Sequence, residues 1–298
     1  MKAIETKQLT KNYGKSRGIE EVSFTVEKGD IFGFLGPNGA GKSTTIRCLL
    51  GMLHYEAGEA RILGYSVDRD QKEILARVGY MPSEAMFYPS LRVKDVIKLA
   101  ADIRGVDCRQ EAERLCNKLE VNTSKKVHEL SLGNRKKVSI ICAMQHKPEL
   151  LIFDEPTSGL DPLMQEAFFE LVTESNKEGA TVFMSSHVLP EVRKYCKHVG
   201  IIKEGRLIET DTVENLTKTG LRRIKLTGIS DLVGMDGMKD VKKSVNELEF
   251  TYTGDVRMLI SRLQGMPLQD IMISEPSLEE VFMHFYEKEK EVHSYDNF

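Results

Sequence analysis

Gly36-Pro37-Asn38-Gly39-Ala40-Gly41-Lys42-Ser43-Thr44 is the stretch that decides the fold. The apolar run Ile31–Leu35 precedes it and the apolar-rich residues 45–50 follow it, which predicts a strand, a tight loop and a helix. Glycines let the backbone turn successive N–H groups inward around an anion. The start of the helix adds unpaired N–H groups and the positive end of its dipole. The stretch therefore predicts a loop that binds the phosphates of a nucleoside triphosphate.

Within this loop, Lys42 is placed to reach the β- and γ-phosphates, and the Ser43 hydroxyl is placed to hold Mg²⁺. The other residues from Gly36 to Thr44 are candidate phosphate contacts through their backbone. The alternative interpretation is a glycine turn followed by a surface lysine. The strand before the loop and the helix after it favour the phosphate site.

Composition narrows the class of protein. The 298 residues include 41% hydrophobic residues, 42 Lys plus Arg and 45 Asp plus Glu, for a net charge of -3. This balance predicts no nucleic-acid partner. The five scattered cysteines form no CxxC pair, which favours reduced thiols over disulfides or a zinc site. No apolar run is long enough to cross a bilayer, so we expect a cytoplasmic protein that reaches the membrane only through a partner.

Periodicity along the chain predicts an α/β fold with a mostly parallel sheet. The opening residues alternate apolar and polar, as in antiparallel β structure, and residues 58–82 are expected to form short strands. Residues 93–145 show a helical pattern, with apolar residues on one stripe. Buried strands are expected at residues 150–153, 180–184 and 199–202, with a helix at residues 164–175 between the first two.

The pattern changes after about residue 216. We expect a cassette over residues 1–216, with a helical subdomain at about residues 84–147, and a small C-terminal α+β domain over residues 217–298. That domain is expected to close with a helix at residues 277–289, where Ser277 and Glu280 form a capping box.

Asp154 and Glu155 follow the buried strand at residues 150–153. A carboxylate at the end of a central strand, beside a phosphate site, suits a Mg²⁺ ligand, and we assign that role to Asp154. Glu155, expected to point the other way along the pleat, could orient or deprotonate an attacking water. Without the phosphate loop upstream, both acids could equally be residues where a strand meets solvent.

Four more segments carry a family resemblance: Tyr13 after Leu9-Thr10-Lys11-Asn12, Leu130-Ser131-Leu132-Gly133-Asn134, Ser158-Gly159-Leu160-Asp161, and His187 after two serines. With the loop and the two acids, the stretch from about residue 7 to residue 216 resembles the nucleotide-binding subunit of ATP-binding cassette (ABC) transporters. Taken singly, Tyr13 could be a surface turn residue, Ser131 an ordinary helix N-cap and His187 a surface histidine.

The resemblance implies ATP and Mg²⁺ as ligands and a working dimer, either of two copies or of this chain with a relative. It implies that Tyr13 stacks on adenine and that Ser131 and Gly133 cap the nucleotide of the opposite subunit. It also implies that Asp161 links the two sites and that His187 contacts the γ-phosphate.

Three positions depart from the family pattern. Ser83 stands where the family places the glutamine of its Q-loop, and Glu84 follows; either Glu84 reaches the metal or water, or that contact is lost. Leu132 replaces a glycine of the LSGGQ signature and Asn134 replaces its glutamine. A missing glycine there would loosen the cap over the phosphate.

The segment at residues 275–282 resembles the terminal helix of exporter ATPases that pair with ABC-2 type membrane permeases. The leading hypothesis is therefore an ATPase that powers export of a drug, a peptide or a lipid-like molecule through a separate permease. The alternatives are a soluble ABC ATPase that acts on ribosomes or DNA, a subunit that binds nucleotide and gates with little hydrolysis, and an importer.

Overall fold

An antiparallel sheet opens the chain, as the alternating pattern predicted. The computed structural model describes residues 1–14, 16–217, 221–232, 234–274 and 280. The first sheet has the order β2-β1-β4-β5, and its strands pair antiparallel. They are β1 (Lys2–Tyr13), β2 (Ser16–Glu27), β4 (Ala57–Ile62) and β5 (Tyr65–Ser66).

The second sheet carries the phosphate loop. Its order is β10-β9-β3-β8-β7-β6, and the five strands from β9 to β6 run parallel. The six strands of this sheet are β3 (Ile31–Leu35), β6 (Val78–Met81), β7 (Leu150–Asp154), β8 (Thr181–Ser186), β9 (His198–Lys203) and β10 (Arg206–Thr212). The loops after β3, β7 and β8 leave the carboxyl edge of this sheet, which is where ligands bind in parallel sheets.

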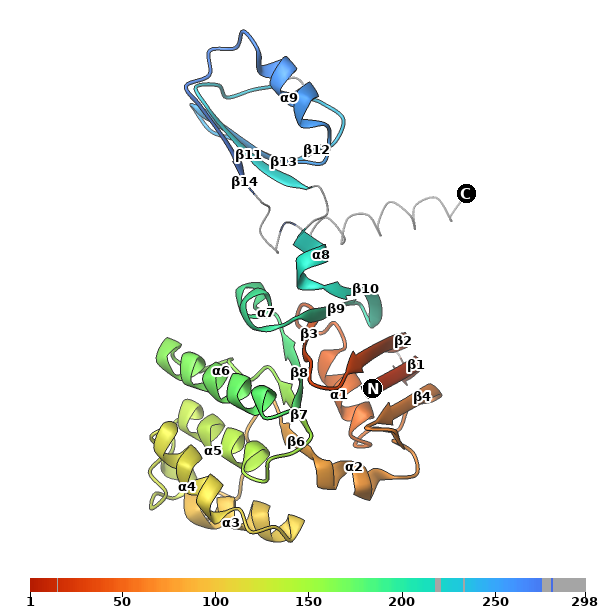
Figure 1. Cartoon of the computed structure of the whole chain (residues 1–298), viewed down its shortest axis with the longest axis vertical. Coiled ribbons are helices and arrows are strands. Elements are labelled where there is room, and N and C mark those ends of the chain that lie inside the picture. The colour runs from red at the N-terminus through yellow and green to blue at the C-terminus, as the bar shows by residue number, and fades with distance from the viewer. Residues whose placement is uncertain (15, 218–220, 233, 275–279, 281–298) are drawn as a thin grey trace. The chain divides into compact units, whose positions relative to one another are not determined.

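Different layers cover the two faces of the parallel sheet (Figure 1). On one face, α1 (Lys42–Leu49) and the antiparallel sheet share an apolar core with it. Phe24 of β2, Phe32 of β3 and Phe183 of β8 stack at the centre of this core, with ring centroids 5.7 to 5.8 Å apart. The other face is covered by α5 (Leu132–Met144), α6 (Pro162–Lys177) and α7 (Leu189–Tyr195).

A helix not expected from the sequence, α2 (Gln71–Arg77), lies within residues 58–82. The prediction of strands alone was wrong there. Ile74 is the one buried residue of this helix, so its sequence shows no apolar stripe. Glu73 in its first turn and Arg77 in its last turn suit the helix dipole.

The helical segment predicted between residues 93 and 145 is confirmed. It contains α3 (Val93–Arg104), α4 (Arg109–Lys118), a short 3-10 turn (Val127–Glu129) and α5. Both α3 and α4 pack against α5, and α5 packs against the edge strand β6. The helix α5 therefore joins the helical segment to the parallel sheet.

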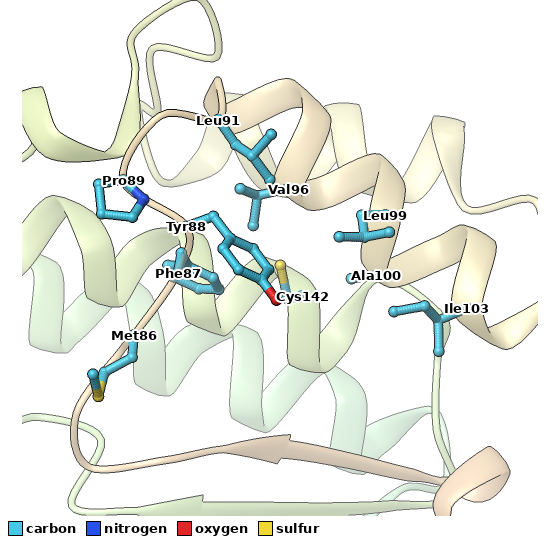
Figure 2. A pocket seen from close by; sticks show the side chains of 10 residues that line it. All are labelled: Met86, Phe87, Tyr88, Pro89, Leu91, Val96, Leu99, Ala100, Ile103 and Cys142. Carbon is cyan, nitrogen blue, oxygen red and sulfur yellow. The ribbon is translucent and has the colours of Figure 1, made fainter.

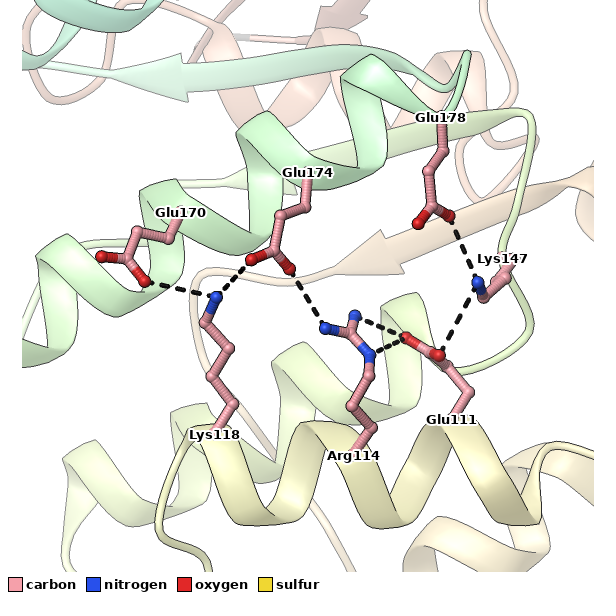
Figure 3. Close-up of polar contacts among 7 residues, drawn as sticks. All are labelled: Glu111, Arg114, Lys118, Lys147, Glu170, Glu174 and Glu178. Atoms are coloured by element: carbon pink, nitrogen blue, oxygen red, sulfur yellow. Dashed lines mark hydrogen bonds and ion pairs between the residues drawn. The ribbon is translucent and has the colours of Figure 1, made fainter.

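Ion pairs link α4 to α6 (Figure 3). Lys118 contacts two glutamates of α6, Glu170 at 3.2 Å and Glu174 at 2.5 Å. Arg114 joins Glu174 to Glu111, and Lys147 contacts Glu111 and Glu178. This continuous chain of opposite charges, which we call the ion-pair ladder, comprises Glu111, Arg114, Lys118, Lys147, Glu170, Glu174 and Glu178.

The chain divides into two compact units, Met1–Asp211 and Thr212–Phe298. The second contains α8 (Val213–Thr217), β11 (Arg222–Thr227), β12 (Met238–Lys243), β13 (Glu247–Tyr252), α9 (Val256–Leu263) and β14 (Asp270–Ser274). Its strands pair in the order β12-β13-β11-β14, and Leu259 and Leu263 of α9 pack on one face of that sheet. The helix expected at residues 277–289 lies outside the described residues, apart from Glu280.

The predicted fold class is confirmed: an α/β nucleotide-binding core with an antiparallel β layer and a helical segment, followed by a small α+β unit. Within the part of the chain that the structure describes, every helix is too short or too polar to span a bilayer.

Candidate nucleotide site

The phosphate loop joins β3 to α1 in a conformation that requires glycine. Gly39 and Gly41 have left-handed φ angles of 78° and 107°. A Cβ on Gly36 would lie 2.4 Å from the carbonyl oxygen of Ile202, so no side chain fits there. The N–H of Gly36 donates to the carbonyl oxygen of Ser186 at 3.2 Å, which ties the start of the loop to the end of β8.

The remaining loop residues divide by exposure. Pro37, Asn38 and Gly39 are exposed at the tip, whereas Ala40 is buried. Ser43 and Thr44 lie half-buried in the first turn of α1, which begins at Lys42. The exposed tip and the N-terminal turn thus present backbone N–H groups and the Ser43 hydroxyl together.

Lys42 is the one charged residue of the loop, and 4% of its side chain is exposed. Its Nζ donates to the carbonyl oxygens of Gly36 at 2.7 Å and Pro37 at 3.0 Å. It also pairs with Oε1 of Glu155 at 3.0 Å. The ammonium group is therefore held at the base of the loop by one carboxylate and two carbonyl dipoles.

Glu155 lies just beyond β7 and contacts two predicted site residues. Its Oε1 pairs with Lys42, and its Oε2 lies 3.2 Å from Nδ1 of the half-exposed His187. The expectation that Glu155 continues the pleat of the strand was wrong, because its φ of 48° is left-handed and turns the chain away from β7. That conformation costs a non-glycine residue about 1–3 kcal/mol and persists only where neighbours enforce it.

Asp154 ends β7 and is fully buried. Its Oδ1 accepts a hydrogen bond from the Ser185 hydroxyl at 2.7 Å, and the Ser185 Oγ in turn accepts from the N–H of Glu155 at 3.0 Å. Among the described residues, Oδ2 of Asp154 has no hydrogen-bond partner. Burial, with the nearby charge of Asp154, raises the pKa of Tyr80 to about 12.

The sequence did not predict a role in this cluster for Ser185 or Lys136. Ser185 stands beside Asp154 in the parallel register of β7 and β8, so aligning the carboxyl ends of the predicted strands could have found it. Lys136 of α5 is 2% exposed, and its Nζ donates to the carbonyl oxygen of Glu155 at 3.0 Å. Burial lowers the pKa of Lys136, and the charges of Glu155 and Asp154 oppose this shift.

The signature segment lies at the start of α5. Ser131 is the N-cap of this helix, and its Oγ accepts from the N–H of Asn134 at 3.3 Å. A Cβ on Gly133 would lie 3.4 Å from the carbonyl oxygen of Gly159, and the Leu132 side chain lies over Gly159. The signature and the loop that contains Asp161 therefore pack against each other.

The other predicted residues stand apart from the Lys42 cluster. Tyr13 ends β1 with 41% exposure, and Asp161 caps α6 by accepting from the N–H of Met164 at 3.0 Å. Ser83 is half-buried and Glu84 is exposed after β6, which neighbours β7. Among the described residues, no hydrogen bond or ion pair joins Tyr13, Ser83, Glu84, Ser131, Gly133 or Asp161 to Lys42, Glu155 or His187.

This arrangement defines a phosphate-loop nucleotide-binding protein, with a buried lysine, two acids and a histidine at the carboxyl edge of a parallel sheet. Residues 19–158 match the sequence family described as ABC transporter. The chain is 34% identical to the bacitracin transport ATP-binding protein BcrA of Bacillus licheniformis, over 94% of this chain and 96% of that protein. It is 30% identical to the linearmycin resistance ATP-binding protein LnrL of Bacillus subtilis (strain 168), over 94% of this chain and 97% of that protein.

A solved structure described as the ATP-binding subunit of an ABC transporter superposes with a TM-score of 0.69 at 30% identity, covering 72% of this chain and 92% of that one. The chain belongs to the ABC transporter family. It is an ATP-binding subunit of that family, an ATPase coupled to transport, and the resemblance inferred from the motifs is confirmed.

Proposed function

We propose that this ATPase powers export of an antibiotic-like or other amphipathic compound through a separate ABC-2 type membrane permease. The contacts of Glu155 with Lys42 and His187 beside the phosphate loop carry the hydrolytic part of the proposal. The export part is supported by relatives named for bacitracin transport and linearmycin resistance that match nearly the whole chain.

In this proposal the Lys42 ammonium group binds the phosphates of ATP. The phosphate oxygens replace the Glu155 carboxylate and the carbonyl oxygens that now surround the Lys42 Nζ. Glu155, once released from Lys42, orients a water toward the γ-phosphorus and accepts its proton. His187, which is 45% exposed and already contacts Glu155, donates to the γ-phosphate. Tyr13 supplies the stacking surface for adenine.

Ser43 and Asp154 would hold Mg²⁺. The buried Oδ2 of Asp154 lacks a partner, and hard carboxylate and hydroxyl oxygens suit this ion. When bound, Mg²⁺ would neutralise charge on the β- and γ-phosphates. The Ser185 hydroxyl fixes the other oxygen of Asp154, so the free oxygen has a defined direction.

The catalytic unit in this proposal is a dimer of this chain. Ser131 and the N–H of Gly133 would cap the γ-phosphate bound in the opposite subunit, with Asp161 beside them. The signature already packs on Gly159 within one chain, so the cap and the loop of Asp161 would move together. ATP favours the closed dimer, and hydrolysis removes that differential affinity.

An apolar hollow of 460 Å³ beside α3 is the proposed seat for the permease (Figure 2). Figure 2 shows that the loop after β6 faces α3 across it, with Cys142 of α5 at its floor. Met86, Tyr88 and Ile103 on its rim are 83%, 72% and 75% exposed, which is unusual for large apolar side chains grouped on one surface. A short amphipathic helix on the cytoplasmic face of the permease would bury them and place this chain at the membrane.

Membrane fractionation tests this docking. In cells that express the transporter, the parent protein should sediment with membranes, and Ile103→Asp should move it to the soluble fraction. Ile103 is exposed, so this change should leave the fold and ATP hydrolysis of the isolated subunit intact. The matched control is Met52→Asp, at an apolar residue that is 53% exposed and lies outside the hollow. Membrane association that survives Ile103→Asp would place the permease elsewhere.

A further inference from the structure

Lys136 is a buried cation without a role in the proposed reaction. It lies on α5 with 2% exposure, and its Nζ donates to a main-chain oxygen, the carbonyl of Glu155, at 3.0 Å. Burying an ammonium group is costly, and a lysine in a merely structural position usually keeps its charged end in water. Its contact is the residue that carries the water-activating carboxylate.

Glu155 needs support at this point because its backbone is left-handed, with a φ of 48°. Three groups hold its two peptide units. Its N–H donates to the Ser185 hydroxyl at 3.0 Å, and its carbonyl accepts from Lys136 and, more weakly at 3.4 Å, from the N–H of Ser158. Of the bonds to the carbonyl, the one from Lys136 is shorter and carries a charge, so it is the stronger.

We propose that Lys136 is a positioning residue for hydrolysis: it fixes the carbonyl of Glu155 so that the carboxylate stays aimed at the γ-phosphate once Lys42 has turned to ATP. The inference rests on the proposed role of Glu155. Lys136 acts through the backbone of Glu155 and contacts neither Lys42 nor His187 in the structure. Removing it therefore affects the chemical step and spares the loop that binds nucleotide.

Steady-state ATP hydrolysis by the full chain tests the proposal. Lys136→Met keeps the length of the side chain and removes the donor and the charge. Lys136→Arg keeps both, and Lys137→Met is the control for loss of a neighbouring lysine. Each variant is compared with the parent and with Glu155→Gln for kcat, KM for ATP, equilibrium ATP affinity and thermal melting.

We expect Lys136→Met to lower kcat about 10- to 100-fold. Its KM, ATP affinity and cooperative melting should stay close to those of the parent, Lys136→Arg should recover most of kcat, and Lys137→Met should match the parent. A Lys136→Met kcat within about twofold of the parent overturns the inference. The inference is also overturned if Lys136→Met loses its cooperative melting transition, its ATP binding and its turnover together, because Lys136 would then be needed for folding. Undiminished turnover in Glu155→Gln would instead refute the proposed role of Glu155 itself.

Discussion

Replacing Glu155 with glutamine should tighten ATP binding while it stops hydrolysis. In the structure the carboxylate of Glu155 holds Lys42 at 3.0 Å, so ATP must compete with it for the same ammonium group. Glutamine has the same shape and keeps an acceptor oxygen but carries no charge. The substitution therefore weakens the contact of residue 155 with Lys42, which competes with the phosphates of ATP. It also removes the group that accepts the proton from water.

The size of the affinity change follows from this contact. A hydrogen bond to a charged group contributes about 1.5–3 kcal/mol and a neutral one about 0.5–1.5 kcal/mol. The ATP-free state should thus lose about 1–1.5 kcal/mol, which makes ATP binding up to about tenfold tighter. The second contact of the carboxylate, to His187, adds little because that ring is half-exposed. Loss of a general base should lower kcat about 10²- to 10⁴-fold.

Equilibrium titration with a fluorescent ATP analogue gives the affinity, and release of inorganic phosphate gives kcat. Glu149→Gln is the matched control, since Glu149 precedes the opposite end of β7 and pairs with Arg77 at the surface. The control should change neither quantity. Weaker ATP binding in Glu155→Gln would show that Glu155 does not compete with ATP for Lys42, and turnover within about tenfold of the parent would show that it is not the general base.

Three further substitutions test the phosphate loop, the ion-pair ladder and a buried histidine of the first unit. Gly36→Ala would place a Cβ 2.4 Å from the carbonyl oxygen of Ile202, so urea unfolding should show a loss of about 1–3 kcal/mol together with loss of ATP binding. Lys118→Met breaks the ion-pair ladder and should cost about 1 kcal/mol in low salt and less in about 1 M salt; an equal loss at both salt levels would argue against an ionic origin. Burial and the charge of Arg104 lower the pKa of His146 from 6.5 to about 4, so the folded chain resists its protonation. The free energy of unfolding should therefore fall as the pH drops from about 6.5 toward about 4. Urea titrations at about pH 7 and about pH 5 measure this fall, which should be about 1–2 kcal/mol smaller in His146→Gln than in the parent.

Much of the fold could be predicted from the sequence because its strongest patterns are local. The strand, loop and helix around Gly36–Thr44 lie next to one another in the chain, and each carries its own signal. Buried parallel strands such as β7 read as unbroken apolar runs. By contrast, α2 buries only Ile74, so its seven residues offer no periodicity to distinguish it from a strand.

The site was predictable only where a residue carries its own motif. Lys42 follows the phosphate loop, Asp154 ends β7 and His187 follows β8, so each has a local signal, but the contacts that these residues make come from tertiary structure. Lys136 lies on a helix, 19 residues before Glu155, and only the packing of α5 brings its Nζ to the Glu155 carbonyl. The direction of Glu155 likewise depends on a left-handed backbone conformation, which glutamate does not favour and which the sequence therefore does not predict.

In the proposed cycle, ATP joins two copies of this chain and hydrolysis separates them. The most direct test is the mass of the Glu155→Gln variant by light scattering, with and without ATP and Mg²⁺. We expect the mass of one chain without nucleotide and of two chains with ATP and Mg²⁺, and a return to one chain when ADP replaces ATP. A single-chain mass at saturating ATP and Mg²⁺ would contradict the proposed cycle.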